Sequence, residues 1–296
     1  MILTQIFQYC LSGITVGSIY VIIAIGFNII YNTTGIINFA QGEFLIMGAM
    51  IATTFSAFMP LAAAVLLAVL ITALIGALIE FSFIRGIKTP SVLRLIIITI
   101  GVAIIIREAM LHIWDEQIRA LPYFTGSEVT SIEVLGAHIS PQVLWVLGIS
   151  AIIVLALGVF FSFTLTGRAM RACAANRNSA RLCGINVRRM VTLSFMLSAG
   201  IGALAGCVIS PLTQTQYNMG ASLAIKGFTV AVLGGLGNSM AAVAAGLLLG
   251  LLEAFSISLL PLAYKDAVAI TLLLVILFLR PSGIFGSRQA SALKEF

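Results

Sequence analysis

Charged residues are scarce in this sequence: Asp, Glu, Lys and Arg together make up 9% of the 296 residues, while hydrophobic residues make up 60%. The mean hydropathy is +1.15. About a quarter of the residues in a typical soluble globular domain are charged, because its surface must be solvated. The scarcity of charge therefore excludes a soluble globular domain and indicates an integral membrane protein.

Residues that carry out catalysis or bind metals are scarce too. The 4 cysteines are scattered without CxxC spacing, and the 2 histidines, His112 and His138, have no partner at metal-ligand spacing. The sequence contains no GxxxxGK(S/T) loop for ATP phosphates, no GxSxG and no HExxH. We therefore expect a chain that is not an enzyme and that itself binds no metal, cofactor or nucleic acid.

Long apolar runs are what the sequence has in abundance. About 20 apolar residues in a helix cross a bilayer core of about 30 Å with every backbone hydrogen bond made internally. The runs are continuous rather than alternating, which argues against a transmembrane barrel. We predict an all-α polytopic membrane protein, one transmembrane domain over 1–296, with eight or nine transmembrane helices that include short or re-entrant segments. The expected runs are 6–30, 36–58, 61–84, 92–113, 143–163, 191–209, 223–236, 241–260 and 267–279.

Basic residues predict the orientation of these helices, because Lys and Arg collect on the cytoplasmic side. The loop 164–190 holds six arginines and no acidic residue, whereas the loop 114–141 is mostly acidic. We expect 164–190 and the C-terminus to be cytoplasmic, 114–141 to be periplasmic, and the N-terminus to lie outside as part of a retained first span. The basic residues are Arg85, Lys88, Arg94, Arg168, Arg171, Arg177, Arg181, Arg188, Arg189, Arg280, Arg288 and Lys294, and the acidic ones are Asp115, Glu116, Glu128 and Glu133, opposed by Arg119.

A few polar residues fall within the runs, where ionisable groups are costly and often functional. Asn38, Gln41 and Glu43 are expected in the opening turns of a helix at the inner membrane boundary, where free N–H groups favour oxygen atoms. Alternatively, they contribute to a translocation path or face a partner subunit. Glu253 is either a contact for a substrate ammonium group or a carboxylate bonded to a neighbouring helix, and Lys226 is expected to snorkel to the outer surface.

The loop 164–190 predicts two short helices, 169–175 and 179–183, with a break at 176–178. Asn178 can cap the second helix, and Gly184 suits a left-handed position at its end. Arginines surround these slim, alanine-rich helices. The loop either inserts into a groove on a partner protein or binds lipid headgroups.

The motifs resemble the LivH-type permease subunit of bacterial ABC importers for branched-chain amino acids. The resemblance rests on GRAMRA at 167–172, followed by Asn176, Ala180, Gly184, Ile185 and Asn186. INFAQGE at 37–43, GGLGNSMAAVAAGLLLGLLE at 234–253 and RPSGIFG at 280–286 extend it over nearly the whole chain. The chain departs from the family pattern after Asn238, where many relatives have a Pro-Gly or small-residue turn.

This resemblance implies an ABC importer permease fold in the bacterial inner membrane. Its partners would be membrane lipid, a second homologous permease, a periplasmic substrate-binding protein and two cytoplasmic ATPase subunits, which would hold ATP and Mg. The substrate would be a branched-chain or other apolar amino acid; urea, amides or sugars are alternatives within this class, and a secondary transporter or channel is the alternative outside it. The residues implied to couple to the ATPases are Gly167, Arg168, Arg171, Ala172, Asn176, Ala180, Gly184 and Ile185.

Overall fold

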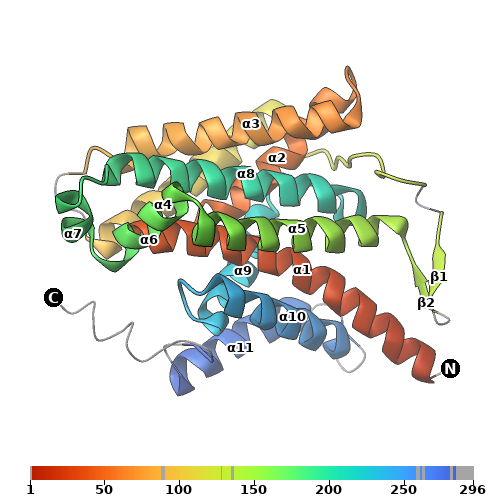
Figure 1. Cartoon of the computed structure of the whole chain (residues 1–296). Coiled ribbons are helices and arrows are strands. Elements are labelled where there is room, and N and C mark those ends of the chain that lie inside the picture. The colour runs from red at the N-terminus through yellow and green to blue at the C-terminus, as the bar shows by residue number, and fades with distance from the viewer. Residues whose placement is uncertain are drawn as a thin grey trace.

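A computed structural model of the chain describes residues 2–87, 91–127, 129–134, 137–257, 261, 264–280 and 283–284. Within these residues the chain is a bundle of helices with one small antiparallel hairpin (Figure 1). The predicted Lys88, Glu128, Arg288 and Lys294 lie outside the described residues. The elements are α1 (Ile2–Thr34), α2 (Gln41–Ser56), α3 (Leu61–Ile79), the π-helical turn η1 (Glu80–Ile84), α4 (Val92–Trp114), β1 (Ile132–Val134), β2 (Ala137–Ile139), α5 (Pro141–Phe163), α6 (Leu165–Ala175), α7 (Arg177–Leu182), α8 (Val187–Thr213), α9 (Gly220–Gly234), α10 (Ser239–Ser256) and α11 (Lys265–Leu279).

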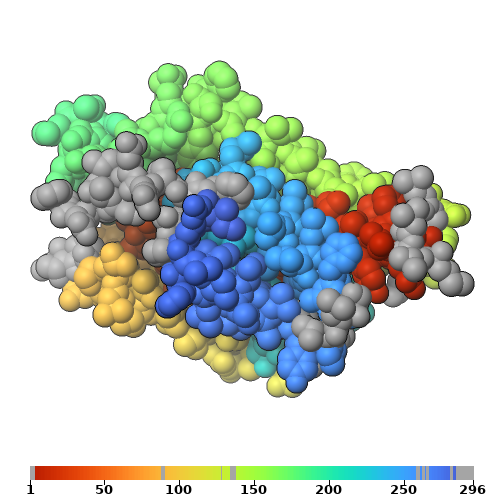
Figure 2. All heavy atoms as spheres, turned by 90° about the horizontal axis from the view of Figure 1, so that it is seen from below, coloured from red at the N-terminus to blue at the C-terminus, as the bar shows by residue number. Residues whose placement is uncertain are grey.

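Five of the described helices are long and apolar enough to cross a membrane, which confirms a multi-pass, all-helical membrane protein. They are Thr4–Thr34, Leu61–Ile84, Pro141–Phe163, Val187–Thr213 and Ser239–Ser256. The predicted run 223–236 forms α9, which has 15 residues and is too short to cross a bilayer alone. It contacts α1, α2, α10 and α11, and of these α10 and α11 lie on the face of the molecule shown in Figure 2.

The two ends of the bundle differ in what they carry (Figure 1). The N-terminus and the β1–β2 hairpin lie at one end, which we call the hairpin end, and α6 and α7 lie at the other, which we call the basic end. The N-terminus is thus opposite the arginine-rich segment, the arrangement expected from the distribution of charge.

The start of α2 lies inside the bundle. Glu43 is in the first turn of α2, as predicted, but the helix does not begin at the basic end, where the sequence placed it. The backbone N–H of Phe39 donates to Thr99 Oγ1 at 3.3 Å. Gln41, the first residue of α2, lies against Gly26, which is eight residues, or about 12 Å along the helix axis, before the end of α1 at Thr34.

Glycines allow close helix packing between α1 and α10. Gly13 and Gly17 of α1 face Gly246 and Gly250 of α10, and a Cβ atom built on Gly250 would clash with the Gly13 carbonyl oxygen and with Gly17. Small residues at four-residue spacing let helices approach closely where hydrocarbon surrounds them. These four glycines therefore determine how closely α1 and α10 approach each other.

Gly250→Leu should lower the stability of the protein by about 1–3 kcal/mol or more, because the added side chain overpacks this contact. Thermal unfolding of the purified protein in detergent would measure the effect. Gly101→Leu is the matched control, since a Cβ on Gly101 has no atom within 4 Å. Equal melting temperatures for the two variants would contradict the packing role of Gly250.

Candidate functional site

The segment from α6 to the start of α8 is held by a side-chain cap at each of its junctions. Thr164 Oγ1 accepts from Gly167 N at 3.0 Å, and Asn186 Oδ1 accepts from Arg189 N at 3.1 Å. Asn176 Oδ1 accepts from the backbone N–H groups of residues 178 and 179 at 2.9 and 3.0 Å. The predicted cap by Asn178 is therefore wrong, because α7 begins two residues earlier than expected. Gly184 has φ +80°, the left-handed conformation predicted for it.

This segment has a small hydrophobic core of its own. Cys173, Ala180 and Val187 are buried together, with Ala172 and Ile185 packed against them. Burial raises the pKa of the Cys173 thiol above its usual range. Capped ends and a shared core make α6 and α7 one rigid unit rather than two mobile turns.

Arg177 links this unit to the first helix. Its Nη2 atom donates to the Thr33 carbonyl oxygen near the end of α1 at 3.3 Å. Burial lowers the pKa of the Arg177 guanidinium from its usual value. The carbonyl of Thr33 belongs to the last turn of α1, where backbone oxygens lack helical partners, so the arginine satisfies one of them.

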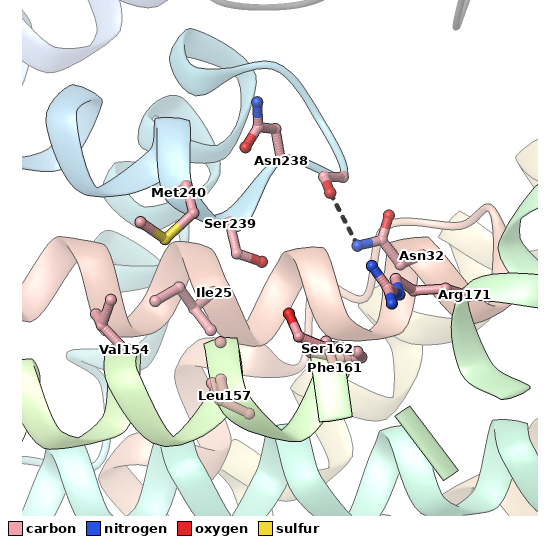
Figure 3. A pocket seen from close by; sticks show the side chains of 12 residues that line it. Ile25, Asn32, Val154, Leu157, Phe161, Ser162, Arg171, Asn238, Ser239 and Met240 are labelled. Atoms are coloured by element: carbon pink, nitrogen blue, oxygen red, sulfur yellow. Dashed lines mark hydrogen bonds between the residues drawn. The ribbon is translucent and has the colours of Figure 1, made fainter. Parts of the chain in front are cut away.

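The predicted coupling residues divide into three groups by position. Gly167, Ala172, Ala180 and Ile185 are inside the segment, and Asn176 and Gly184 shape its turns. Arg168 is exposed. Arg171 is also exposed, but it lines a groove of about 290 Å³ between α5, α10 and the end of α1 (Figure 3).

The buried side chains of Gln41 and Asn38 near α2 form hydrogen bonds within the chain, although Asn38 Nδ2 has no partner among the described residues. Gln41 Nε2 donates to the Ser198 carbonyl oxygen at 3.1 Å, and the Ser198 hydroxyl lies 2.5 Å from Gln41 Oε1 and 2.8 Å from the carbonyl oxygen of Gly26. Asn38 Oδ1 accepts from Ala40 N at 3.2 Å. Asn38 and Gln41 are buried, so they do not face a partner subunit from the surface of this chain.

Glu43 forms an ion pair with Arg107 of α4. Arg107 Nη2 lies 2.5 Å from Glu43 Oε1, and the side chain of Glu43 is 1% exposed while that of Arg107 is 28% exposed. The carboxyl group also lies against Gly220, the first residue of α9. One carboxylate thus sits where α2 and α9 both begin, and the positive ends of two helix dipoles favour it there.

Glu253 has partners that the sequence did not identify. Tyr20 donates its hydroxyl to Glu253 Oε2 at 2.6 Å, and Lys226 Nζ lies 2.7 Å from Glu253 Oε1. Lys226 is buried, so its predicted snorkelling to the outer surface is wrong. A lysine and a glutamate that both lie within apolar runs can indicate a buried ion pair. Lys226 and Glu253 are in different helices, however, and their positions in the sequence do not show that these helices bring them into contact.

Lys226→Met should destabilise the protein by about 3–5 kcal/mol, because it leaves a buried carboxylate without its cation. The double variant Lys226→Met with Glu253→Gln should recover most of this loss, since it removes both charges. Thermal unfolding of the three proteins in detergent would measure the effect. A double variant as unstable as the single one would show that the pair is not the source of the loss.

Comparison with known proteins gives consistent matches over nearly the whole chain. Residues 9–277 match the family described as branched-chain amino acid transport system / permease component. The chain is 34% identical over 296 residues to the high-affinity branched-chain amino acid transport system permease protein BraD of Pseudomonas aeruginosa, which covers 94% of this chain and 95% of that protein. It is 33% identical over 294 residues to the corresponding LivH protein of Escherichia coli, with the same two coverages of 94% and 95%.

Among solved structures, PsaBC from Streptococcus pneumoniae in complex with Fab contains a similar chain. The TM-score is 0.50 over 93% of this chain and 91% of that chain, with 12% sequence identity, which indicates a shared fold alone. The sequence matches, in contrast, confirm the resemblance that GRAMRA and the other motifs predicted. The chain belongs to the family of permease components of branched-chain amino acid transport systems, and it is a transport subunit rather than an ATPase.

Proposed function

We propose that this chain imports branched-chain amino acids across the bacterial inner membrane as one half of a permease pair. A homologous permease forms the other half, a periplasmic binding protein delivers the substrate, and two cytoplasmic ATPases, which hold ATP and Mg, supply the energy. The family match and the names of the BraD and LivH relatives support the substrate and this assembly. The similar fold of the PsaBC chain supports the arrangement of helices alone.

The α6–α7 unit gives the strongest structural support for coupling to a partner protein. It is rigid, it lies at the basic end of the bundle, and Arg177 ties it to α1. When a partner protein displaces a rigid unit of this kind, the transmembrane helices attached to it move as well. A flexible loop would change its own conformation instead. We assign 164–190 as the cytoplasmic coupling loop and 114–141 as the periplasmic loop of one transmembrane domain.

The path for the substrate is proposed to be largely apolar. Asn38, Gln41, Glu43 and Glu253 are all buried within this chain. The bonds of Gln41, Glu43 and Glu253 to neighbouring helices, and the local bond of Asn38 to the backbone of Ala40, favour structural roles, and the part of these residues in a path stays a prediction. Leu, Ile and Val side chains would pass along such an apolar surface without being trapped, and the binding protein would supply the selectivity.

Uptake of labelled leucine, isoleucine and valine by proteoliposomes that contain the complete transporter tests the proposal. We expect uptake that requires both ATP and the binding protein. Uptake of urea, a short amide or ribose in place of these amino acids would contradict the substrate assignment. Uptake that persists without ATP and the binding protein would indicate a channel or a secondary transporter instead.

Gly184→Val should reduce both amino acid uptake and substrate-stimulated ATP hydrolysis severalfold. A β-branched residue at φ +80° is strained by about 1–2 kcal/mol, which displaces the turn between α7 and α8. The affinity of the binding protein for its amino acid should not change. Gly86→Val is the control, because Gly86 lies in another connection and a Cβ there meets no atom within 4 Å. Normal coupling in Gly184→Val would rule out this role for the turn.

A single cysteine can report the orientation of the chain. Cys183, at the end of α7, is exposed, whereas Cys173 and Cys207 are buried. In a Cys10→Ser background without the ATPases, a membrane-impermeant maleimide should label Cys183 in inside-out vesicles and not in right-side-out ones. The reverse pattern would place the coupling loop in the periplasm.

A further inference from the structure

The groove lined by Arg171 lies on the surface of the helix bundle and is accessible from outside. It lies over α1, between α5 and the first turn of α10 (Figure 3). Gly158 and Ser162 on its α5 side are exposed, and Met240 on its α10 side is 70% exposed. Its volume of about 290 Å³ equals that of about ten water molecules in the liquid, which is enough for a small headgroup and the first methylene groups of a chain.

The lining changes from apolar to polar along the groove (Figure 3). Ile25, Leu157 and Val154 line the part farther from the basic end. The polar side chains, which include Ser162, Ser239 and Arg171, lie nearer the basic end, together with one aromatic residue, Phe161. The side chains of Ser162, Ser239 and Arg171 make no hydrogen bond or ion pair with any described residue. The groove therefore offers an apolar floor and free hydrogen-bond donors within about 10–12 Å, the length of seven or eight helical residues.

The helices that flank the groove present hydrocarbon-like surfaces. On α5, the side chains of Ile152, Leu155 and Val159 are 64%, 68% and 55% exposed. On α10, those of Leu248 and Leu252 are 42% and 43% exposed. Lipid tails are as apolar as these leucine and isoleucine side chains, so an acyl chain can lie along these helices and reach the groove from the side.

We propose that this groove binds one anionic phospholipid, with its phosphate at Arg171 and the start of one acyl chain along Leu157 and Ile25. Charge selects an anionic lipid. The loop 164–190 holds six arginines and no acidic residue, and the lining of the groove contains no acidic residue in the part of the chain that the structure describes. Anionic lipids are concentrated by basic clusters that lie next to transmembrane helices.

The bound lipid connects two elements that the protein itself leaves apart at this point. Its headgroup contacts Arg171 on α6 and Ser239 at the start of α10, while its chain follows α5. The position of α6 relative to α10 therefore depends on whether a lipid occupies the groove. The lipid composition of the membrane thereby acts on the same rigid unit that we propose to couple transport to ATP hydrolysis.

Native mass spectrometry of the purified full chain tests this site, with phosphatidylglycerol and phosphatidylcholine of identical acyl chains added in equal amounts. We expect preferential retention of phosphatidylglycerol. Arg171→Gln should reduce that retention about fivefold, the effect expected for one basic charge near an anionic lipid. Arg181→Gln removes the same charge from an exposed position outside the groove and should have little effect.

A second pair of variants tests the groove itself rather than its charge. A Cβ on Gly158 or on Gly148 has no atom within 4 Å, so both tolerate a larger side chain, but only Gly158 lines the groove. Gly158→Leu should lower retention of phosphatidylglycerol as much as Arg171→Gln does, and Gly148→Leu should not.

Three results would each overturn the proposal: equal retention of the two lipids by the native chain, equal losses in Arg171→Gln and Arg181→Gln, or full retention in Gly158→Leu. Crosslinking of a photoreactive residue at position 158 to the second permease would also overturn it.

Discussion

The structure depends on one constraint: a backbone N–H or C=O group inside a membrane must find its partner within the protein. The constraint is severe here because the chain turns back between Thr34 and Gln41 inside the bundle, where no regular helix satisfies it. Side chains do so instead. Thr34 Oγ1 accepts from Ile36 N at 3.3 Å, Asn38 Oδ1 accepts from Ala40 N at 3.2 Å, and Thr99 of α4 accepts from Phe39 N at 3.3 Å. The polar stretch in the sequence exists because α2 begins inside the protein.

The same constraint explains how neighbouring helices are positioned. Gln41 and Ser198 bond side chain to side chain and side chain to backbone, which fixes α8 against the start of α2. Glu43, in the same first turn of α2, and Arg107 fix α4. Two buried carboxylates, Glu43 and Glu253, pair with Arg107 and Lys226 and so add little to the net charge of the bundle, whereas Glu80, also buried, accepts from the hydroxyl of Thr192 at 2.7 Å. The excess positive charge, +6 for the chain, is therefore located mainly at the ends of the helix bundle.

Local signals in the sequence predicted much of the fold. Apolar runs identified the long helices, the arginines identified the α6–α7 unit, and Gly184 identified the turn after α7. Contacts between distant segments could not be predicted in this way. Tyr20 and Glu253 are 233 residues apart, and nothing in either neighbourhood specifies that they meet. The cap of α7 was misassigned for a different reason: Asn176 and Asn178 are both suitable caps, and sequence alone does not determine at which of them the helix begins.

The length of α1 has a mechanical consequence. At 33 residues it is about 50 Å long, more than the hydrocarbon core of a bilayer requires. Near its first turns, Gln8 exchanges two hydrogen bonds with the backbone of His138 in the hairpin, at 3.0 and 3.1 Å. Near its last turn, the Thr33 carbonyl accepts from Arg177. One unbroken helix thus joins the hairpin end to the basic end, so a shift of the hairpin would be carried along α1 to the α6–α7 unit, on which we propose that the ATPases act.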